Sequence, residues 1–245
     1  MKKTLLRGSI LFCIVLTTIV TVNAQKVKNP DEMSGNELIA NGFKRLFNGS
    51  DLKGWDGPSG SWRIEDSSLT WESTLENPLK DWPYLIWAGG QPENFELLVD
   101  FRVSALANSG VNFRSKKIDE NWGLGGYQAD ITGDERYTGT IYRDHPLRTR
   151  IFRGQSGVES AQGELKVTTF GDAAELQSKT YHPAEWNRIR VICQGPKISY
   201  YLNGVLMSEL IDNGPDSSRK GFIAFQMHQG PPMKIQYKNI YLKEF

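Results

Sequence analysis

The fold is most constrained by residues 95–103, which read Phe95-Glu96-Leu97-Leu98-Val99-Asp100-Phe101-Arg102-Val103. Every odd-numbered residue of this stretch is apolar, whereas Asp100 and Arg102 alternate with them. Successive side chains of a β-strand point to opposite faces, so the pattern predicts a strand that buries one face and presents polar groups on the other.

Similar short runs recur on both sides of this stretch, separated by Gly, Pro, Asn and Asp. The dipeptide Asn203-Gly204 predicts a tight hairpin turn, and a change of apolar phase near Lys238–Asn239 predicts a β-bulge. No apolar pattern at helical spacing exceeds about ten residues, so we expect an all-β jelly-roll sandwich of two antiparallel sheets. Residues 146–177 are the least regular and are predicted to form long loops at one rim. The runs lie at residues 62–65, 69–73, 84–87, 95–103, 111–114, 127–131, 186–193, 198–206, 222–228 and 233–243.

Composition and charge exclude several classes of protein. Of 245 residues, 39% are hydrophobic, which excludes collagen-like, disordered and multi-span membrane chains. The 29 basic and 28 acidic residues nearly balance, so electrostatics gives no reason to expect nucleic acid or anionic lipid as a partner.

The first 24 residues have the order of a cleavable secretory signal. Lys2, Lys3 and Arg7 precede the apolar stretch Ile10–Val22, and small residues end at Ala24. The apolar stretch is roughly 13 residues long, too short to cross a bilayer comfortably. We therefore expect cleavage after Ala24, export to the periplasm or outer cell surface, and no transmembrane segment in the mature chain. Residues 25–41 are predicted to be a leader, and residues 42–245 a single domain.

Polar side chains recur on the second face of several predicted strands. If these strands are neighbours on one curved sheet, their polar groups line a single concave surface. Amide, guanidinium, carboxylate and imidazole groups beside aromatic rings are what a sugar requires: directional hydrogen-bond partners and an apolar ring to stack on. The alternative is the solvated outer face of an ordinary sandwich. The residues predicted on this surface are Arg102, Asn112, Arg114, Gln128, Asp130, Gln226 and His228.

Four further residues are candidates. Tyr142, Asp144 and His145 lie where a strand enters the irregular rim, and they could join the site or be solvated loop residues. Trp122 is flanked by Asn121 and Gly123 in a glycine-rich loop and is the best exposed platform for a sugar ring.

The sequence lacks the motifs of several other catalytic and metal-binding sites. The chain has no Gly-x-Ser-x-Gly elbow, phosphate-cradling glycine loop, paired-cysteine zinc pattern or Glu-x-Asp-x-x-Glu array of the jelly-roll glucanases. Its three histidines are widely spaced, and the acidic loop with Asp130, Asp134 and Glu135 lacks EF-hand spacing. The sequence therefore requires no cofactor, and a divalent cation stays an open alternative.

Several blocks of the chain match the pattern of one known family: Gly42–Trp55, Phe95–Leu97, Phe101–Arg102, Asn108–Arg114, Gly126–Ile131, Glu185–Asn187, Leu202–Gly204 and Lys238–Ile240. Together these blocks resemble the 3-keto-disaccharide hydrolase family. Singly each is weak, but they follow the family's order from Gly42 to Phe245. The family pattern differs at two places: many members have glutamate where this chain has Gln128, and Tyr-x-Glu where it has Tyr142-Arg143-Asp144.

The resemblance implies a concanavalin-like jelly roll that cleaves glycosides already oxidised at C3. A ketone at C3 acidifies the hydrogen on C2, so a base can remove it and the C1 substituent leaves by elimination, after which water adds. On this interpretation His145 or Asp130 is the base, and Arg114 with Gln128 holds the oxygens. Tyr142 or His228 then donates the proton. Arg102, Asn112, Gln226 and Trp122 complete the expected substrate-binding set.

Two other functions fit the same sequence. A non-catalytic carbohydrate-binding module is compatible, because lectins and laminin-G-like domains share this fold. A conventional glycoside hydrolase that uses Asp130 and Glu135 as its carboxylate pair is the other. The first would retain a sugar without consuming it, and the second would cleave unoxidised glycosides.

Overall fold

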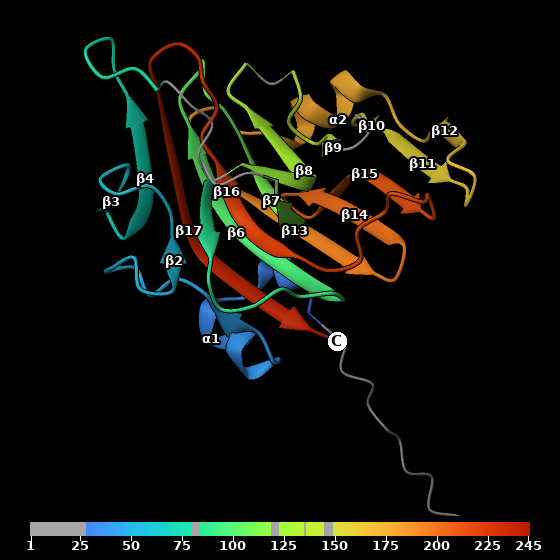
Figure 1. Ribbon diagram of the computed structural model, residues 1–245, viewed down its shortest axis with the longest axis horizontal. Helices are drawn as coiled ribbons and strands as arrows, with labels where there is room; N and C mark the ends of the chain where they lie inside the picture. Colours follow the sequence, from blue (N-terminus) through green and yellow to red (C-terminus); the bar gives the residue numbers. More distant parts are fainter. Residues whose placement is uncertain (1–27, 80–83, 119–122, 135, 145–148) are drawn as a thin grey trace, which may run out of the picture.

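The computed structural model describes residues 28–79, 84–118, 123–134, 136–144 and 149–245, and within them the chain forms two packed β-sheets (Figure 1). The larger sheet has the order β12-β11-β15-β14-β13-β6-β17-β4-β3, with β1 paired to β17. The smaller has the order β10-β9-β8-β7-β16-β5-β2. The strands are β1 Lys44–Arg45, β2 Trp55–Asp56, β3 Trp62–Glu65, β4 Ser68–Ser73, β5 Tyr84–Trp87, β6 Phe95–Val103, β7 Asn108–Lys117, β8 Leu124–Thr132, β9 Ile141–Asp144, β10 Thr149–Ile151, β11 Gln155–Glu159, β12 Leu165–Thr169, β13 Asn187–Gln194, β14 Lys197–Leu202, β15 Val205–Asp212, β16 Phe222–Gln226 and β17 Met233–Glu244.

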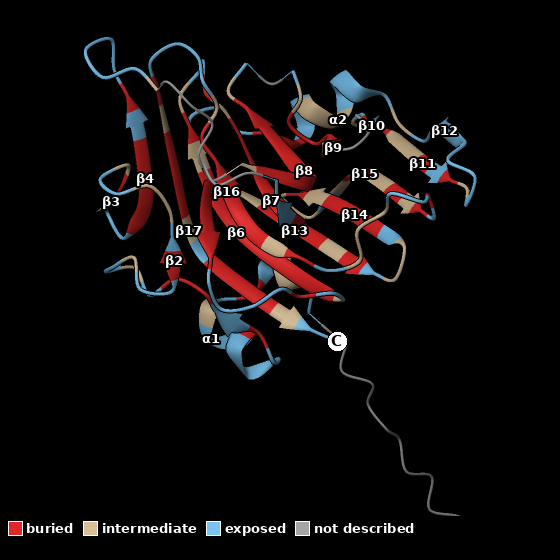
Figure 2. Cartoon of the chain, viewed as in Figure 1, coloured by how far each residue is buried: buried red, intermediate tan, exposed pale blue. Residues whose placement is uncertain are grey.

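The core lies between the sheets and is built by the alternation that the sequence shows. Phe95, Leu97, Val99 and Phe101 of β6 are fully buried, and residues of β7, β8 and β16 face them (Figure 2). Aromatic rings contribute strongly, since Phe225 stacks on Tyr237 with ring centroids 4.1 Å apart. The two-sheet jelly-roll prediction is confirmed.

Two local predictions are also confirmed. Asn203 and Gly204 have φ angles of 46° and 83° at the turn between β14 and β15, as a tight hairpin turn requires. The register of β17 against β6 shifts between Lys238 and Tyr241, and Asn239 has φ 49° there. The Asn239 side chain donates to Asp100 Oδ2 at 2.7 Å, which ties the bulge to β6.

The prediction of long loops over residues 146–177 is wrong. This segment contains β10, β11, β12 and the start of α2 (Ala173–Thr180). All five residues of β12 are exposed, so it lacks the buried alternation that signals a strand. The β11–β15 pair is parallel, an exception in sheets predicted to be antiparallel.

Part of the predicted leader packs against the larger sheet. The 3-10 helix η1 (Pro30–Glu32) precedes α1 (Gly35–Ala40), which begins with a capping box between Ser34 and Glu37. Leu38 is buried against Leu98 and Tyr241, on the face of the larger sheet opposite the core. Residues 1–24 lie outside the described residues, so the signal peptide stays a prediction. No helix in the described part of the chain is long and apolar enough to cross a membrane.

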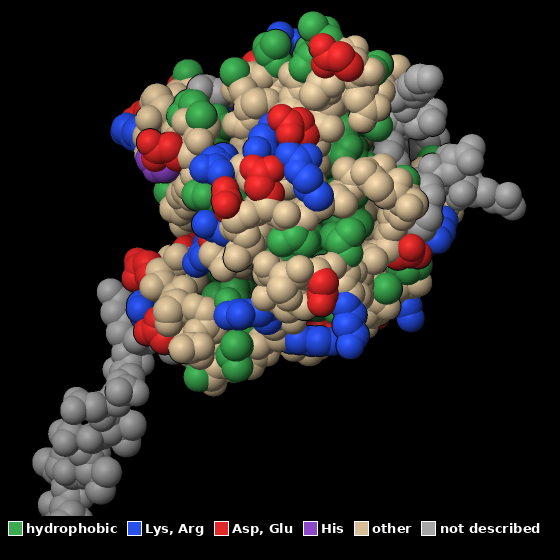
Figure 3. Space-filling view, turned by 90° about the vertical axis from the view of Figure 1, so that its left-hand side faces the viewer, with side chains coloured by type: hydrophobic (Ala, Val, Ile, Leu, Met, Phe, Trp, Pro, Cys, Tyr) green, Lys and Arg blue, Asp and Glu red, His purple; other side chains and the backbone are tan. Residues whose placement is uncertain are grey.

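Charges of both signs are interspersed where β3 and β4 close one end of the sandwich (Figure 3). Arg63 Nη2 lies 2.8 Å from Glu65 Oε2 and 2.6 Å from Glu72 Oε2, and Lys234 also pairs with Glu65. Exposed pairs of this kind contribute at most about 1 kcal/mol each.

Candidate active site

A polar basin of about 170 Å³ lies on the smaller sheet, on the face turned away from the core. Cross-strand register builds it: Arg150 of β10 lies opposite Tyr142 of β9, which lies opposite Gln128 of β8. The volume is below the about 300–1,000 Å³ of drug-sized ligand pockets, so it suits a single small ring. The lining residues are Tyr84, Asn108, Gln128, Asp130, Tyr137, Tyr142, Asp144, Arg150, Gln226 and His228.

Strand β8 supplies the centre of the basin. Tyr127, Ala129 and Ile131 are fully buried in the core, so alternation sends Gln128 and Asp130 to the opposite face. Gly110 of β7 lies directly opposite Asp130, and a Cβ at this glycine would lie 2.4 Å from Gln128 Cδ. The glycine therefore makes room for the Gln128 side chain to lie across β7.

Hydrogen bonds connect the basin's side chains in one chain. Gln128 Nε2 donates to Asp130 Oδ1 at 2.6 Å and to Gln226 Oε1 at 3.2 Å, which uses both hydrogens of its amide. Gln226 Nε2 in turn donates to Tyr84 Oη at 3.3 Å. Four side chains from three strands are thereby held in a fixed arrangement, as a preorganised site requires.

Burial gives two of these groups unusual protonation behaviour. Desolvation raises the pKa of Asp130 to about 7, although the Gln128 hydrogen bond and the Arg150 charge act to lower it. Burial raises the pKa of Tyr84 to about 12, and the nearby Asp144, Tyr142 and Asp130 add to the effect. Asp130 can therefore gain or lose a proton near neutral pH, while Tyr84 keeps its proton.

Aromatic and charged groups form the rim. The Arg150 guanidinium lies 5.1 Å from the ring centroids of both Tyr137 and Tyr142. Tyr142 Oη donates to Asp144 Oδ1 at 3.3 Å. His228 Nδ1 lies 2.5 Å from the carbonyl oxygen of Gln229; because a carbonyl only accepts, Nδ1 is the donor.

The structure brings six predicted site residues together. The residues that line the basin as predicted are Gln128, Asp130, Tyr142, Asp144, Gln226 and His228. Their roles stay predictions.

Arg102 and Asn112 do not line the basin, and for Arg102 the predicted place on the shared surface is wrong. Arg102 belongs to β6 in the other sheet; its guanidinium donates to Gln236 Oε1 at 2.8–3.0 Å and lies 4.9 Å from the Trp186 ring centroid. Alternation predicts which face of a strand is buried but not which sheet the strand joins. Asn112 lies opposite Gln128 in register and so is on the predicted face, but it does not line the basin.

Arg114 is also wrongly predicted as a sugar ligand. It is fully buried, and it donates to the carbonyl oxygen of Glu93 through Nε at 3.0 Å and Nη2 at 2.6 Å. Its Nη1 donates to the carbonyl oxygen of Gly195 at 2.9 Å. The register of β7 against β8 shifts between Phe113 and Lys116, and Arg114 has φ 48° within this bulge. The bulge breaks the alternation that the prediction assumed.

Three candidates, His145, Trp122 and Glu135, lie outside the described residues. Four basin residues were missed by the sequence analysis. Tyr84 lies in a strand with apolar residues on both faces, which gives no sign of a site. Arg150 falls in the segment predicted to be irregular. Asn108 and Tyr137 lie at the start of a strand and in a turn.

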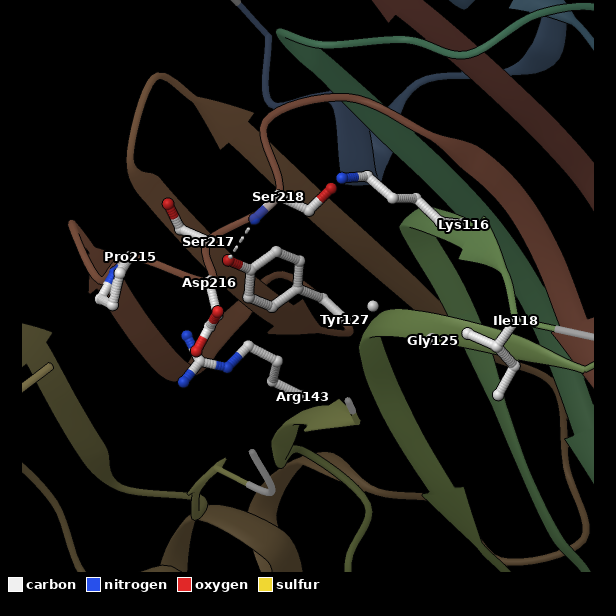
Figure 4. A pocket seen from close by; sticks show the side chains of 10 residues that line it. Lys116, Ile118, Gly125, Tyr127, Arg143, Pro215, Asp216, Ser217 and Ser218 are labelled. Atoms are coloured by element: carbon white, nitrogen blue, oxygen red, sulfur yellow. Dashed lines mark hydrogen bonds between the residues drawn. The ribbon is translucent and has the colours of Figure 1, made fainter. Parts of the chain in front are cut away.

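A larger cavity of about 420 Å³ lies at the other end of β7 and β8 (Figure 4). Arg143 lines this cavity, and its Nη1 lies 2.5 Å from Asp212 Oδ2 and 2.9 Å from Glu159 Oε2. Both carboxylates are buried. The Tyr127 hydroxyl donates to Asp212 Oδ2 at 2.6 Å and accepts from the Ser218 backbone N–H. Its buried charges are thus committed to one another, so the smaller basin is the better candidate for chemistry.

No group of three or more His, Cys, Asp or Glu residues in the described part of the chain is arranged to hold a metal ion. Asp130, Asp144 and His228 all line the basin without forming such a group.

Comparison with known proteins gives one family and several structural neighbours. The family model of 3-keto-alpha-glucoside-1,2-lyase-like domains matches residues 42–243. No curated protein matches the chain. A candidate glycosyl hydrolase from Parabacteroides distasonis has a TM-score of 0.56 at 19% identity, covering 85% of this chain and 96% of its own.

A carbohydrate-binding module of family CBM66 from Bacillus subtilis has a TM-score of 0.53 at 11% identity, covering 78% of this chain and 96% of its own. At these identities both structures show a shared fold only.

Proposed function

Because the chain belongs to the family of 3-keto-alpha-glucoside-1,2-lyase-like domains, we propose that it cleaves 3-keto-glycosides by elimination across C1 and C2, followed by hydration. A carbohydrate-related role follows from the family. The observation that supports the finer proposal is Asp130, a carboxyl group whose pKa burial raises to about 7, in a basin of hydrogen-bonding side chains.

Asp130 is proposed as the base. Its carboxylate takes the proton from C2, and the electron pair of that C–H bond forms an enediolate with the C3 oxygen. A base is most effective when its pKa lies near the working pH, because it is then both deprotonated and able to accept a proton. Gln128 holds Oδ1 of this carboxylate, which directs the other oxygen toward the substrate.

Tyr84 and Arg150 are proposed to stabilise the negative oxygen of the enediolate. A hydroxyl that accepts a hydrogen bond, as Tyr84 does from Gln226, still has its own proton to donate. Arg150 brings a positive charge to the same basin, in the role that the sequence had assigned to Arg114. One preorganised donor of this kind contributes about 3 kcal/mol to transition-state stabilisation.

Collapse of the enediolate re-forms the C3 ketone, creates a C1–C2 double bond and breaks the bond from C1 to the glycosidic oxygen. That oxygen leaves with a proton, for which the proposed donor is Nε2–H of the His228 imidazolium, because the Nδ1 hydrogen is bonded to the Gln229 carbonyl oxygen. Tyr142 is the alternative donor. Water then adds its oxygen to C1 and a proton to C2. The sum is hydrolysis of the glycoside without an oxocarbenium ion.

Turnover assays separate this reaction from the alternatives. Purified protein is incubated with methyl 3-keto-glucoside and with the unoxidised parent, each with and without a chelator, and the released products are quantified. Cleavage of the keto substrate alone is expected. Cleavage of the parent would indicate a conventional glycosidase, and binding without product in a calorimeter would indicate a binding module; either result would refute the proposal.

The Gln128→Met variant is expected to move the acid limb of the pH–kcat/KM profile to higher pH. The Gln128 hydrogen bond lowers the pKa of Asp130, so its loss raises that pKa further. The Gln194→Met variant changes an exposed glutamine of β13 and serves as the control. If the acid limb of the Gln128→Met profile does not move, or moves to lower pH, the proposed effect of Gln128 on the pKa of Asp130 is contradicted.

A further inference from the structure

A second cavity of about 290 Å³ adjoins the basin. Asn108, Tyr137 and His228 line both, so these three side chains form a common wall. We propose that this second cavity receives the leaving group of the substrate and that it selects an apolar aglycone. The inference rests on the proposed function, because it requires that the 3-keto ring occupies the basin.

On the proposed mechanism, the leaving group lies at this wall. The glycosidic oxygen is bonded to C1, and C1 is bonded to C2. A ring that presents its C2 hydrogen to Asp130 therefore holds the glycosidic oxygen two bonds from C2. His228 lies on the wall between the two cavities, where a proton donor would reach that oxygen. A substituent beyond the oxygen then extends into the second cavity.

The loop that carries the apolar lining is held firmly. Leu106 follows β6, and the next residue, Ala107, donates its N–H to the carbonyl oxygen of Ser104 at 2.9 Å and accepts from Gly133 N at 2.8 Å. A Cβ at Gly133 would lie 2.0 Å from the Ser104 carbonyl oxygen, so a glycine permits this close approach. The cavity is therefore preformed, which favours binding of a rigid group.

The lining itself favours an apolar group. Leu106, which is 62% exposed, lines the cavity together with Pro231 and Met233, so aliphatic side chains form part of its wall. The charged lining residues pair with each other, since Arg136 Nε lies 3.7 Å from Asp134 Oδ2. Both side chains are exposed to solvent. A second sugar would require more fixed hydrogen-bond partners than an aliphatic surface offers.

Two substrates with alkyl leaving groups test the inference. Methyl and 2-phenylethyl 3-keto-glucosides release alcohols of similar acidity, so their kcat/KM values differ mainly through aglycone binding. We expect the wild-type protein to prefer the 2-phenylethyl substrate about 10-fold, the lower end of what hydrophobic pockets discriminate. The Leu106→Asp variant is expected to lose most of that preference.

The control is Leu75→Asp, which places the same charge at a leucine that is 81% exposed and lines neither cavity. Thermal unfolding of each variant confirms that the fold is retained. Equal kcat/KM values for both substrates in the wild type, or an equal loss for both in Leu106→Asp, would overturn the inference while leaving the proposed function intact. Faster turnover of 3-keto-trehalose than of the 2-phenylethyl substrate would overturn the apolar assignment. Absence of turnover of every 3-keto substrate would instead refute the proposed function, and the inference with it.

Discussion

The Asp130→Asn variant is expected to lose about 10³-fold in kcat/KM on a 3-keto-glucoside and to be more stable than the wild type at pH 8. The activity falls because an amide cannot accept the C2 proton, and general base catalysis contributes about 10²–10⁴-fold. Asparagine has the same shape as aspartate and can still accept the hydrogen bond from Gln128, so the basin keeps its arrangement.

The gain in stability follows from the raised pKa of Asp130. The folded protein holds this proton up to about pH 7, whereas the ordinary carboxyl of the unfolded chain loses it near pH 3.8. Between these values the folded state binds more protons, so the free energy of unfolding decreases as the pH rises and the penalty is complete above about pH 7. A difference of roughly three pKa units corresponds to about 4 kcal/mol, and asparagine removes it.

Denaturant unfolding at pH 4 and pH 8 measures this effect. The variant and the wild type should have similar stability at pH 4, and the variant should be more stable by about 3–4 kcal/mol at pH 8. Asp134→Asn, at an exposed carboxylate of the neighbouring loop, is the control and should show no such divergence. Equal stability of variant and wild type at both pH values would contradict a buried, raised-pKa carboxyl at residue 130.

The Arg114→Met variant is expected to do the opposite: to lose about 3 kcal/mol of stability and to keep kcat/KM within about twofold of wild type. The fully buried guanidinium satisfies the carbonyl oxygens of Glu93 and Gly195, and a buried acceptor left without a donor costs about 1–3 kcal/mol. Methionine fills much of the volume but donates no hydrogen bond. Activity is retained because Arg114 does not line the basin.

Assays of Arg114→Met are made well below its unfolding transition, so that loss of folded protein does not imitate loss of catalysis. The control is Arg63→Met, which removes an exposed arginine and should cost at most about 1 kcal/mol. A stable Arg114→Met protein with kcat/KM reduced 100-fold would restore the role that the sequence alone suggested for this residue.

The two residues show what alternation does and does not predict. Asp130 lies in a regular strand, so the buried neighbours Ala129 and Ile131 correctly predict the face on which its side chain lies. Arg114 lies in a bulge with positive φ, and a bulge depends on the partner strand rather than on local sequence. Asp130 was therefore found from the sequence because its strand alternates regularly. Arg114 was misplaced because the bulge interrupts that alternation.

The sequence pattern also does not predict which sheet a strand joins. Arg102 has the same local pattern as Gln128, yet β6 joins the larger sheet through pairing with β13 and β17, which are distant in the chain. Tyr84 was missed because Leu85, Ile86 and Trp87 follow it and all four residues of β5 are buried. Its hydroxyl becomes recognisable only when Gln226 lies beside it.

Turnover of a 3-keto-glucoside in deuterated water tests most directly whether the C2 hydrogen is removed during cleavage. The substrate carries ordinary hydrogen at C2, and the released sugar is analysed by mass spectrometry and NMR before non-enzymatic exchange becomes significant. Proton abstraction by Asp130 followed by hydration predicts solvent deuterium at C2 of the product, and the Asp130→Asn variant should form this deuterated product about 10³-fold more slowly. A product that keeps its original C2 hydrogen, formed at the wild-type rate, would show that the glycosidic bond breaks by direct displacement and would contradict the elimination proposed for this protein.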